Sequence, residues 1–126
     1  MADKLRGNPV LEPGAYGSFD EFGLGEPAVW VSQGRYWMLY TGRDASENRR
    51  LGVAQSRDGV RWEKLPIVFA GDQAWNAKVI CDPSVEPAEG AVRVWFGGGD
   101  AASPDENLNG QIGLATLRLV GATLAK

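Results

Sequence analysis

A 20-residue stretch returns in altered form 56 residues later, and this repeat constrains the fold more than any other feature of the chain. Residues 25–44, GEPAVWVSQGRYWMLYTGRD, align without gaps with residues 81–100, CDPSVEPAEGAVRVWFGGGD. A duplication of this length indicates supersecondary units that stack on one another. The identical or chemically similar pairs are Glu26/Asp82, Pro27/Pro83, Val29/Val85, Gly34/Gly90, Tyr40/Phe96, Gly42/Gly98 and Asp44/Asp100.

Each unit is predicted to be a four-stranded antiparallel sheet, with first-copy strands at residues 27–32, 35–42, 50–56 and 60–69. Gln33-Gly34 and Asp58-Gly59 read as hairpin turns, and the Asp-Gly pair favours a type I′ turn. In residues 35–41 both alternating sets of side chains are bulky, so both faces of the sheet should be covered. The sequence therefore predicts an all-β fold with two β-propeller blades per chain.

The connections between these strands predict where a site would lie. With antiparallel strands, residues 12–25, 43–49, 70–81 and 99–109 all fall at one end of the blades, and the tight turns fall at the other. Long loops at one end of a rigid scaffold are where sites are usually built.

Composition excludes several classes of protein. A chain of 126 residues that is 44% hydrophobic and 23% charged is not disordered, and no apolar run approaches the ~20 residues of a membrane span. With a net charge of -3 and scattered basic residues, the sequence does not predict the basic patch that binding to nucleic acid or an anionic membrane requires. The start of the sequence lacks the apolar core of a signal peptide, and Cys81 is the single cysteine, so a cytoplasmic protein is expected.

The absence of histidine limits the chemistry. It removes Ser-His-Asp and Cys-His catalysis together with histidine-ligated zinc. Acid-base chemistry would therefore depend on carboxylates. Cys81, next to Asp82, is interpreted as a small buried residue at the wall of a central funnel.

Five motifs along the chain resemble one superfamily: NPVLEPG, GSFDEFGLGEPAV, GRYWMLYTG, LGVAQSRDGVRWEK and DPSV. It is that of the five-bladed propellers of the arabinanase, levansucrase and invertase type, with relatives in glycoside hydrolase families 43, 32 and 130. In that superfamily an acidic residue before proline opens each inner strand. The resemblance implies that Glu26 is the general acid and that Asp82 is a base or a residue that modulates the pKa of the acid. Glycoside cleavage needs one protonated and one ionised carboxyl, about 5 to 9.5 Å apart.

The chain also departs from the family pattern. It has about two blades and two acid-proline positions where the family has five blades and usually three acids, and its Glu precedes its Asp although the family 43 order places the Glu last. Three functions stay open: an enzyme that hydrolyses a furanoside or pyranoside glycan, a lectin-like module without turnover, and a vestigial or structural fragment. An acidic residue before proline can also have a purely structural role, in which its carboxylate accepts hydrogen bonds from backbone N–H groups.

Seven residues at the long-loop end are candidate sugar-binding groups. The rings of the two aromatic residues suit stacking on a sugar and suit equally well a plug between blades. The charged residues at the strand exits suit hydroxyl binding or turn capping. The seven are Phe19, Asp20, Arg43, Asp44, Trp75, Asn76 and Asp100.

Two further motifs carry weaker predictions. Asp105, Asn107 and Asn109 place oxygen ligands at alternate positions as in a calcium loop, but Thr116 stands where a bidentate Glu is expected. Calcium is therefore a candidate, and no other metal or cofactor is expected. SRDGVRW resembles the Asp-box of sialidase-like propellers without the residue between Asp and Gly, so it is interpreted as a structural hairpin with Trp62 packed beneath it.

The ends of the repeat predict assembly. NPVLE aligns with the outer strand LPIVF at an offset of 57, whereas the second repeat lacks a counterpart of the DGVRW hairpin. We expect one domain, with an outer strand and entry loop at 1–24, blade 1 at 25–69 and blade 2 at 70–126. Pro9–Glu12 of one copy would complete blade 2 of a neighbour in a cyclic homo-oligomer. A six-bladed trimer, similar to the two-blade fucose-binding lectins, is the first choice and a four-bladed dimer the second.

Overall fold

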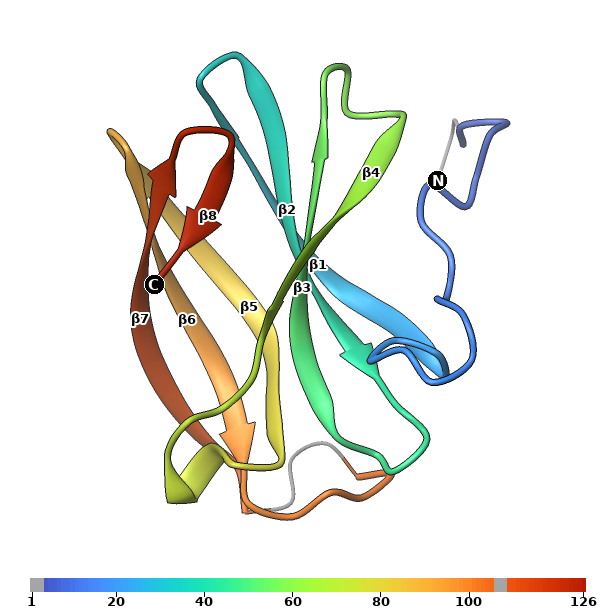
Figure 1. The fold of residues 1–126 in the computed structure, drawn as a ribbon, viewed down its shortest axis with the longest axis vertical. Coiled ribbons are helices and arrows are strands. Elements are labelled where there is room, and N and C mark those ends of the chain that lie inside the picture. The colour runs from blue at the N-terminus through green and yellow to red at the C-terminus, as the bar shows by residue number, and fades with distance from the viewer. Residues whose placement is uncertain (1–3, 106–108) are drawn as a thin grey trace.

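A computed structural model describes residues 4–105 and 109–126, and these form two antiparallel meanders of four strands each (Figure 1). Blade 1 is β1–β4 and blade 2 is β5–β8, so the predicted all-β, two-blade architecture is confirmed. The described part of the chain has no helix with the length and apolarity of a membrane span. The elements are β1 (Gly23–Ser32), β2 (Arg35–Arg43), β3 (Arg49–Ser56), β4 (Trp62–Phe69), a 3-10 turn (Ala74–Asn76), β5 (Val79–Ala88), β6 (Ala91–Gly99), β7 (Gln111–Val120) and β8 (Thr123–Ala125).

Strands β2 and β3 of blade 1 are covered on both faces, as the bulky alternation in residues 35–41 predicts. One face carries Leu39 and Val53, which are 0% exposed and pack against Val92 and Val94 of blade 2. The opposite face carries Tyr40 with Met38 and Ala54, and the loop before β1 packs on it. The main core therefore lies between the two blades, which stack face to face.

The turns at the upper end of Figure 1 differ in kind. Gln33 and Gly34 both have positive φ (53° and 73°), the requirement of a tight primed turn. The prediction of a type I′ turn at Asp58-Gly59 is wrong. Ser56 and Trp62 are paired, and Asp58 Oδ1 accepts hydrogen bonds from the amides of residues 60 and 61, each 2.9 Å long, so the carboxylate caps a wider loop.

Trp62 is packed beneath that loop, as the sequence predicts. Its Nε1 donates to the Gly59 carbonyl at 2.9 Å, and its ring meets Tyr36 edge to face at 6.5 Å. The motif is therefore a structural hairpin at the end of the blades that lies away from the long connections (Figure 1).

The long connections all lie at the lower end of Figure 1, as expected from the sequence. A single parallel pair, Arg49 with Val79, joins the sheets of the two blades there. The Arg49 side chain is buried and donates to the Ser103 carbonyl at 2.8 Å and to the Pro104 carbonyl at 3.4 Å. This guanidinium ties the β3 end of blade 1 to the loop after β6 in blade 2.

The outer strands of the two blades are unequal. In blade 1, β4 pairs with β3 from residue 51 to residue 56, whereas in blade 2 the short β8 pairs only with residues 118–120 of β7. The sequence did not indicate β8. Pro9–Glu12, expected as an outer strand, is not part of a strand in the described single chain, so its pairing with a neighbour stays a prediction.

Candidate functional site

The inner strand of each blade opens with the same distorted acid-proline unit. Glu26 has φ 54° and Asp82 has φ 53°, and each lies in a bulge of the ladder, between residues 25 and 28 in β1 and between residues 81 and 84 in β5. A left-handed backbone costs a non-glycine residue roughly 1–2 kcal/mol. The same costly conformation at two equivalent acids suggests a functional constraint.

These two bulges bring the acids into direct contact across the blades. The Asp82 amide donates to Glu26 Oε1 and to Thr41 Oγ1, at 3.1 Å in each case. Burial raises the pKa of Asp82, and the hydrogen bond and negative charge of Glu26 raise it further, while a hydrogen bond with Cys81 opposes the rise. The two carboxyls therefore form a pair that holds a proton to higher pH than an isolated Asp would.

Cys81 completes a compact set of donor atoms at this point. Its Sγ and one carboxylate oxygen from each of Glu26 and Asp82 lie within 4.8 Å of one another, close enough to hold a metal ion. Cys81 is buried, as predicted. The thiol lies against the acid pair at the inner edge of the stacked blades.

Phe19 and Trp75, the two aromatic candidates for stacking on a sugar, occupy equivalent positions on the faces of their blades. Phe19 lies over Gly42 and Gly52, with its ring 5.9 Å from that of Tyr40. Trp75 lies over Gly98 and Gly113, with its ring stacked on Phe96 at 6.0 Å and 12°. Of the two interpretations of these rings, this packing favours a plug on the blade face.

Their polar neighbours Asp20 and Asn76 are buried beside the plugs. The Asp20 carboxylate accepts hydrogen bonds from Lys64 Nζ at 2.7 Å and from the Tyr40 hydroxyl at 3.3 Å. Burial and the Asp20 charge raise the pKa of Tyr40. Asn76 Oδ1 accepts from the Gln73 amide at 2.9 Å. Both residues therefore hold the entry loops in place.

The charged candidates at the strand exits also have local partners. Arg43 pairs with Glu47 at 2.6 Å. Asp44 caps its own turn; burial would raise its pKa, but hydrogen bonds from Arg50, from Asn48 and from backbone amides outweigh burial and lower it.

Asp100, at the equivalent exit of β6, accepts from Asn109 Nδ2 at 3.2 Å. For the calcium hypothesis, Asp105 is exposed, Asn109 bonds Asp100, and Asn107 lies outside the described residues.

Two contributors to the site were not predicted. Thr41 accepts the Asp82 amide, yet the equivalent residue in the second repeat is Gly97, so the repeat gave no signal. Arg49 lines a cavity of about 210 Å³ together with Glu26 and Thr41. The only sequence signal for Arg49 was a cation placed directly before an apolar strand.

No family model matches the sequence. An uncharacterized protein of Mycobacterium tuberculosis (strain CDC 1551 / Oshkosh) is 35% identical over an alignment of 83 positions, which covers 61% of this chain and 28% of that protein. The chain thus spans less than a third of the length of this relative.

Solved structures of glycoside hydrolases share the fold. A protein of Parabacteroides distasonis assigned as a glycoside hydrolase matches with a TM-score of 0.75 and 20% identity, over 90% of this chain and 38% of that one. A Bacteroides ovatus protein with the same assignment matches with a TM-score of 0.72 and 22% identity, over 90% and 37%. A thermostable family-43 glycoside hydrolase matches with a TM-score of 0.68 and 18% identity, over 97% and 42%.

The chain therefore spans about two fifths of the length of these structures. At identities of 22% and below, the likeness establishes the fold. The fold that the sequence resemblance implies is thereby confirmed: the chain folds as propeller blades like those of these solved glycoside hydrolases.

Proposed function

We propose that this chain is a carbohydrate-processing propeller unit whose Glu26–Asp82 pair supplies a proton for cleavage of a glycosidic bond. The observation that carries the proposal is the contact itself. Two acids from equivalent strand starts, 56 residues apart, meet in one strained geometry, and the pKa of one of them is raised. A carboxyl whose pKa is raised keeps its proton to higher pH, which is the property that a general acid requires.

The spacing favours a proton donor and its modulator over a donor and a base. Carboxyls that act on opposite sides of a sugar are about 5–5.5 Å apart in retaining enzymes and 6.5–9.5 Å apart in inverting enzymes. Here the nearest carboxylate oxygens of Glu26 and Asp82 lie within 4.8 Å, and the two groups share a hydrogen bond. The proton belongs to the pair, and a third acid would serve as base or nucleophile.

Turnover tests the proposal directly. Aryl arabinofuranosides, xylosides, fructosides and mannosides are offered to the wild-type chain, to Glu26→Gln and to Asp82→Asn. Each substitution removes an ionisable oxygen at little change in volume, so turnover should be lost while the fold is kept. Glu89→Gln, at the exposed turn of the opposite end, is the matched control and should keep wild-type turnover.

A second readout follows the proton rather than the product. Carbon NMR of the side-chain carboxyls should show Asp82 titrating above the usual range for Asp, and Glu26→Gln should lower that pKa because a negative neighbour is removed. Sugar binding without turnover would leave the lectin-like alternative. Neither binding nor turnover on any of the four sugars would refute the carbohydrate proposal.

A further inference from the structure

Blade 2 carries a face on which Ile112 and Leu114 have no cover in the described chain, although the Arg93 guanidinium lies over the neighbouring Trp95 ring at 4.9 Å. Ile112 is 80% exposed and Leu114 is 52% exposed, and Leu114 pairs with Trp95 across the ladder. The same face of blade 1, at the positions that the repeat makes equivalent, is fully buried. There the corresponding residues are Leu51 at 3%, Val53 at 0% and Leu39 at 0% exposure.

What buries those residues of blade 1 is the opposite face of blade 2. That face includes Val92 and Val94, each 1% exposed, with Val85 packed beside them. Blade 1 has the corresponding face too, and it is turned away from blade 2. On it Val29 is 46% exposed and Val31 is 58% exposed. The chain thus presents the apolar part of its own internal interface at each outer side. On blade 2 the positions of the buried Trp30 and Trp37 are taken by Glu86 and Arg93, which form an exposed ion pair.

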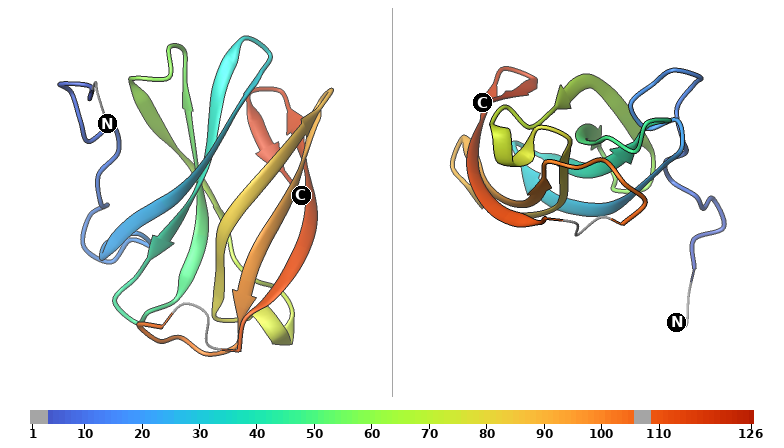
Figure 2. Two further views of the ribbon diagram at one scale, coloured as in Figure 1. Left: turned by 180° about the vertical axis from the view of Figure 1, so that it is seen from behind. Right: turned by 90° about the horizontal axis from the view of Figure 1, so that it is seen from below.

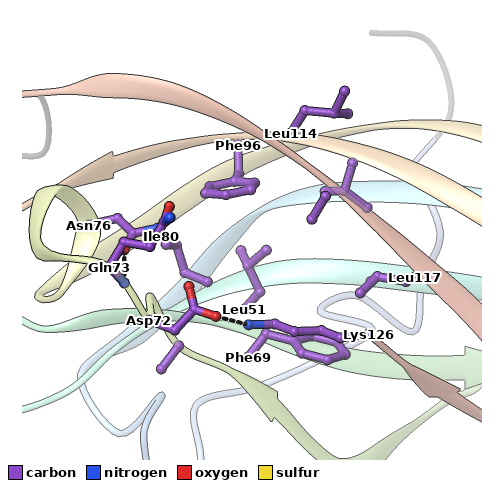
Figure 3. A pocket seen from close by; sticks show the side chains of 13 residues that line it. Leu51, Phe69, Asp72, Gln73, Asn76, Ile80, Phe96, Leu114, Leu117 and Lys126 are labelled. Carbon is purple, nitrogen blue, oxygen red and sulfur yellow. Dashed lines mark hydrogen bonds and ion pairs between the residues drawn. The ribbon is translucent and has the colours of Figure 1, made fainter.

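The N-terminal segment is already placed for such a contact. Leu11 lines a cavity of about 180 Å³ with Leu24, Met38 and Tyr40. The repeat equivalents of Leu24, Met38 and Tyr40, 56 residues later, are Ile80, Val94 and Phe96. These line a cavity of about 260 Å³ together with Phe69, the last residue of β4 (Figure 3). The segment therefore lies against blade 1 as the end of β4 lies against blade 2.

The views of the fold agree with this equivalence. The N-terminal segment descends beside blade 1 on the side away from blade 2 (Figures 1 and 2), and β4 descends in the same direction along blade 1 until its lower end comes near blade 2. The difference is in pairing, because β4 hydrogen-bonds to β3 and residues 9–12 have no strand partner in the described chain.

A vacant edge exists on blade 2. Since β8 pairs only with residues 118–120, residues 111–117 of β7 have no ladder partner on that side among the described residues. In blade 1 the equivalent edge carries β4, with Val68 opposite Gly52 and Phe69 opposite Leu51. By the offsets of the repeat, Leu11 would stand opposite Gly113, and Glu12 opposite Ile112.

We propose that a second copy of this chain docks head to tail on blade 2. Its Val29–Val31 face covers Ile112 and Leu114, and its Pro9–Glu12 segment adds as a strand to residues 111–117. The contact repeats the aliphatic part of the interface between blades 1 and 2, with the Glu86–Arg93 ion pair at the positions of Trp30 and Trp37. It also brings Glu26 of the second copy next to Asp82, as Asp82 lies next to Glu26 within one chain. A ring built this way contributes acids from more than one copy to each site.

Sedimentation velocity of the 126-residue chain tests the contact. The expected species is a multiple of 13.6 kDa, with three copies as the first expectation. Ile112→Asp places a charge at the centre of the contact and should weaken association by at least about tenfold. Since Ile112 is 80% exposed, the substitution should leave the circular dichroism spectrum unchanged. Val60→Asp, at a 43% exposed position in the opposite turn, is the matched control.

Cross-linking tests the strand pairing and its direction. A Glu12→Cys chain mixed with an Ile112→Cys chain under mild oxidation should give a disulfide-linked pair, and neither variant alone should do so. A wild-type monomer at every concentration would overturn the proposal. So would oligomers that Ile112→Asp leaves intact, or a mixture of the two cysteine variants that does not cross-link.

Discussion

The packing of Phe19 on blade 1 yields a prediction that distinguishes a packing role of this ring from a sugar-binding role. A Cβ added at Gly42 would lie 2.6 Å from Phe19 Cδ2 and 2.8 Å from Asp20 Cβ, closer than real Cβ contacts. The far end of the ring packs closely on Gly52, where an added Cβ would lie 2.6 Å from Phe19 Cζ, so the ring has little room to move toward the sheet. Gly42→Ala should therefore displace the ring.

Displacing a packed ring costs typically 1–3 kcal/mol, and two contacts with limited room to move place Gly42→Ala near the upper end, about 2–3 kcal/mol. Phe19→Ala alone should cost about 2–4 kcal/mol, below the full range for a buried Phe because the ring is partly exposed. In the Phe19→Ala background the cost of Gly42→Ala should fall below about 1 kcal/mol, which gives a coupling energy of at least about 1–2 kcal/mol.

Urea unfolding of the four proteins in this double-mutant cycle measures these values. Gly25→Ala is the matched control, because it lies in β1 and its Cβ would have no atom within 4 Å. It should change the unfolding free energy by less than about 1 kcal/mol. If Gly42→Ala costs no more than Gly25→Ala, the ring does not rest on Gly42, and the plug interpretation of Phe19 is refuted.

Three further results are expected. Lys64→Met removes the cation from the buried Asp20 carboxyl and should cost about 2 kcal/mol, less than for a fully buried pair because Lys64 is partly exposed. Folding raises the pKa of Asp82, so the contribution of this carboxyl to stability is full below its ordinary pKa and is lost as pH rises through the raised pKa. Asp82→Asn should therefore flatten the dependence of the unfolding free energy on pH and stabilise the protein near neutral pH. Urea titrations across that pH range measure both effects. Millimolar calcium should raise the Tm if Asp105 and Asn109 bind it, since a ligand of the native state adds RT ln(1 + [L]/Kd).

Each of these has a result that would contradict it. Lys126→Met breaks an ion pair with Asp72 in which both side chains are at least half exposed, and it should cost less than about 0.5 kcal/mol; an equal cost for Lys64→Met would refute the burial argument. An Asp82→Asn curve parallel to that of wild type would contradict the raised pKa. A Tm that calcium and a chelator both leave unchanged would exclude the calcium site.

The blade architecture could be predicted because its signals are local. Alternating bulky residues in β2 and the Gln33-Gly34 turn fix strand pairing within a few residues of one another. The site could be predicted only in part. The repeat placed Glu26 and Asp82 at equivalent strand starts, but their contact lies at two left-handed bulges, and the Asp82 amide also donates to Thr41, which the second repeat does not share.

The remaining differences have physical causes of the same kind. The Asp58-Gly59 pair fits a two-residue turn in isolation, yet the Asp58 carboxylate gains more bonds by capping two amides in a wider loop. Burial of Arg49 depends on carbonyls more than 50 residues further along the chain, at Ser103 and Pro104, which no local pattern reveals.

The meander order of the strands has a consequence for how the chain folds during synthesis. Every ladder within a blade joins strands that are neighbours in sequence, so loop closure costs little entropy, and each blade should form quickly for an all-β unit. Blade 1 is complete at Phe69, but Leu39 and Val53 stay exposed until β6 ends at Gly99, about 30 residues later. At ~5–20 residues per second this interval lasts roughly 2–6 s, and it is the period in which the nascent chain is most open to aggregation.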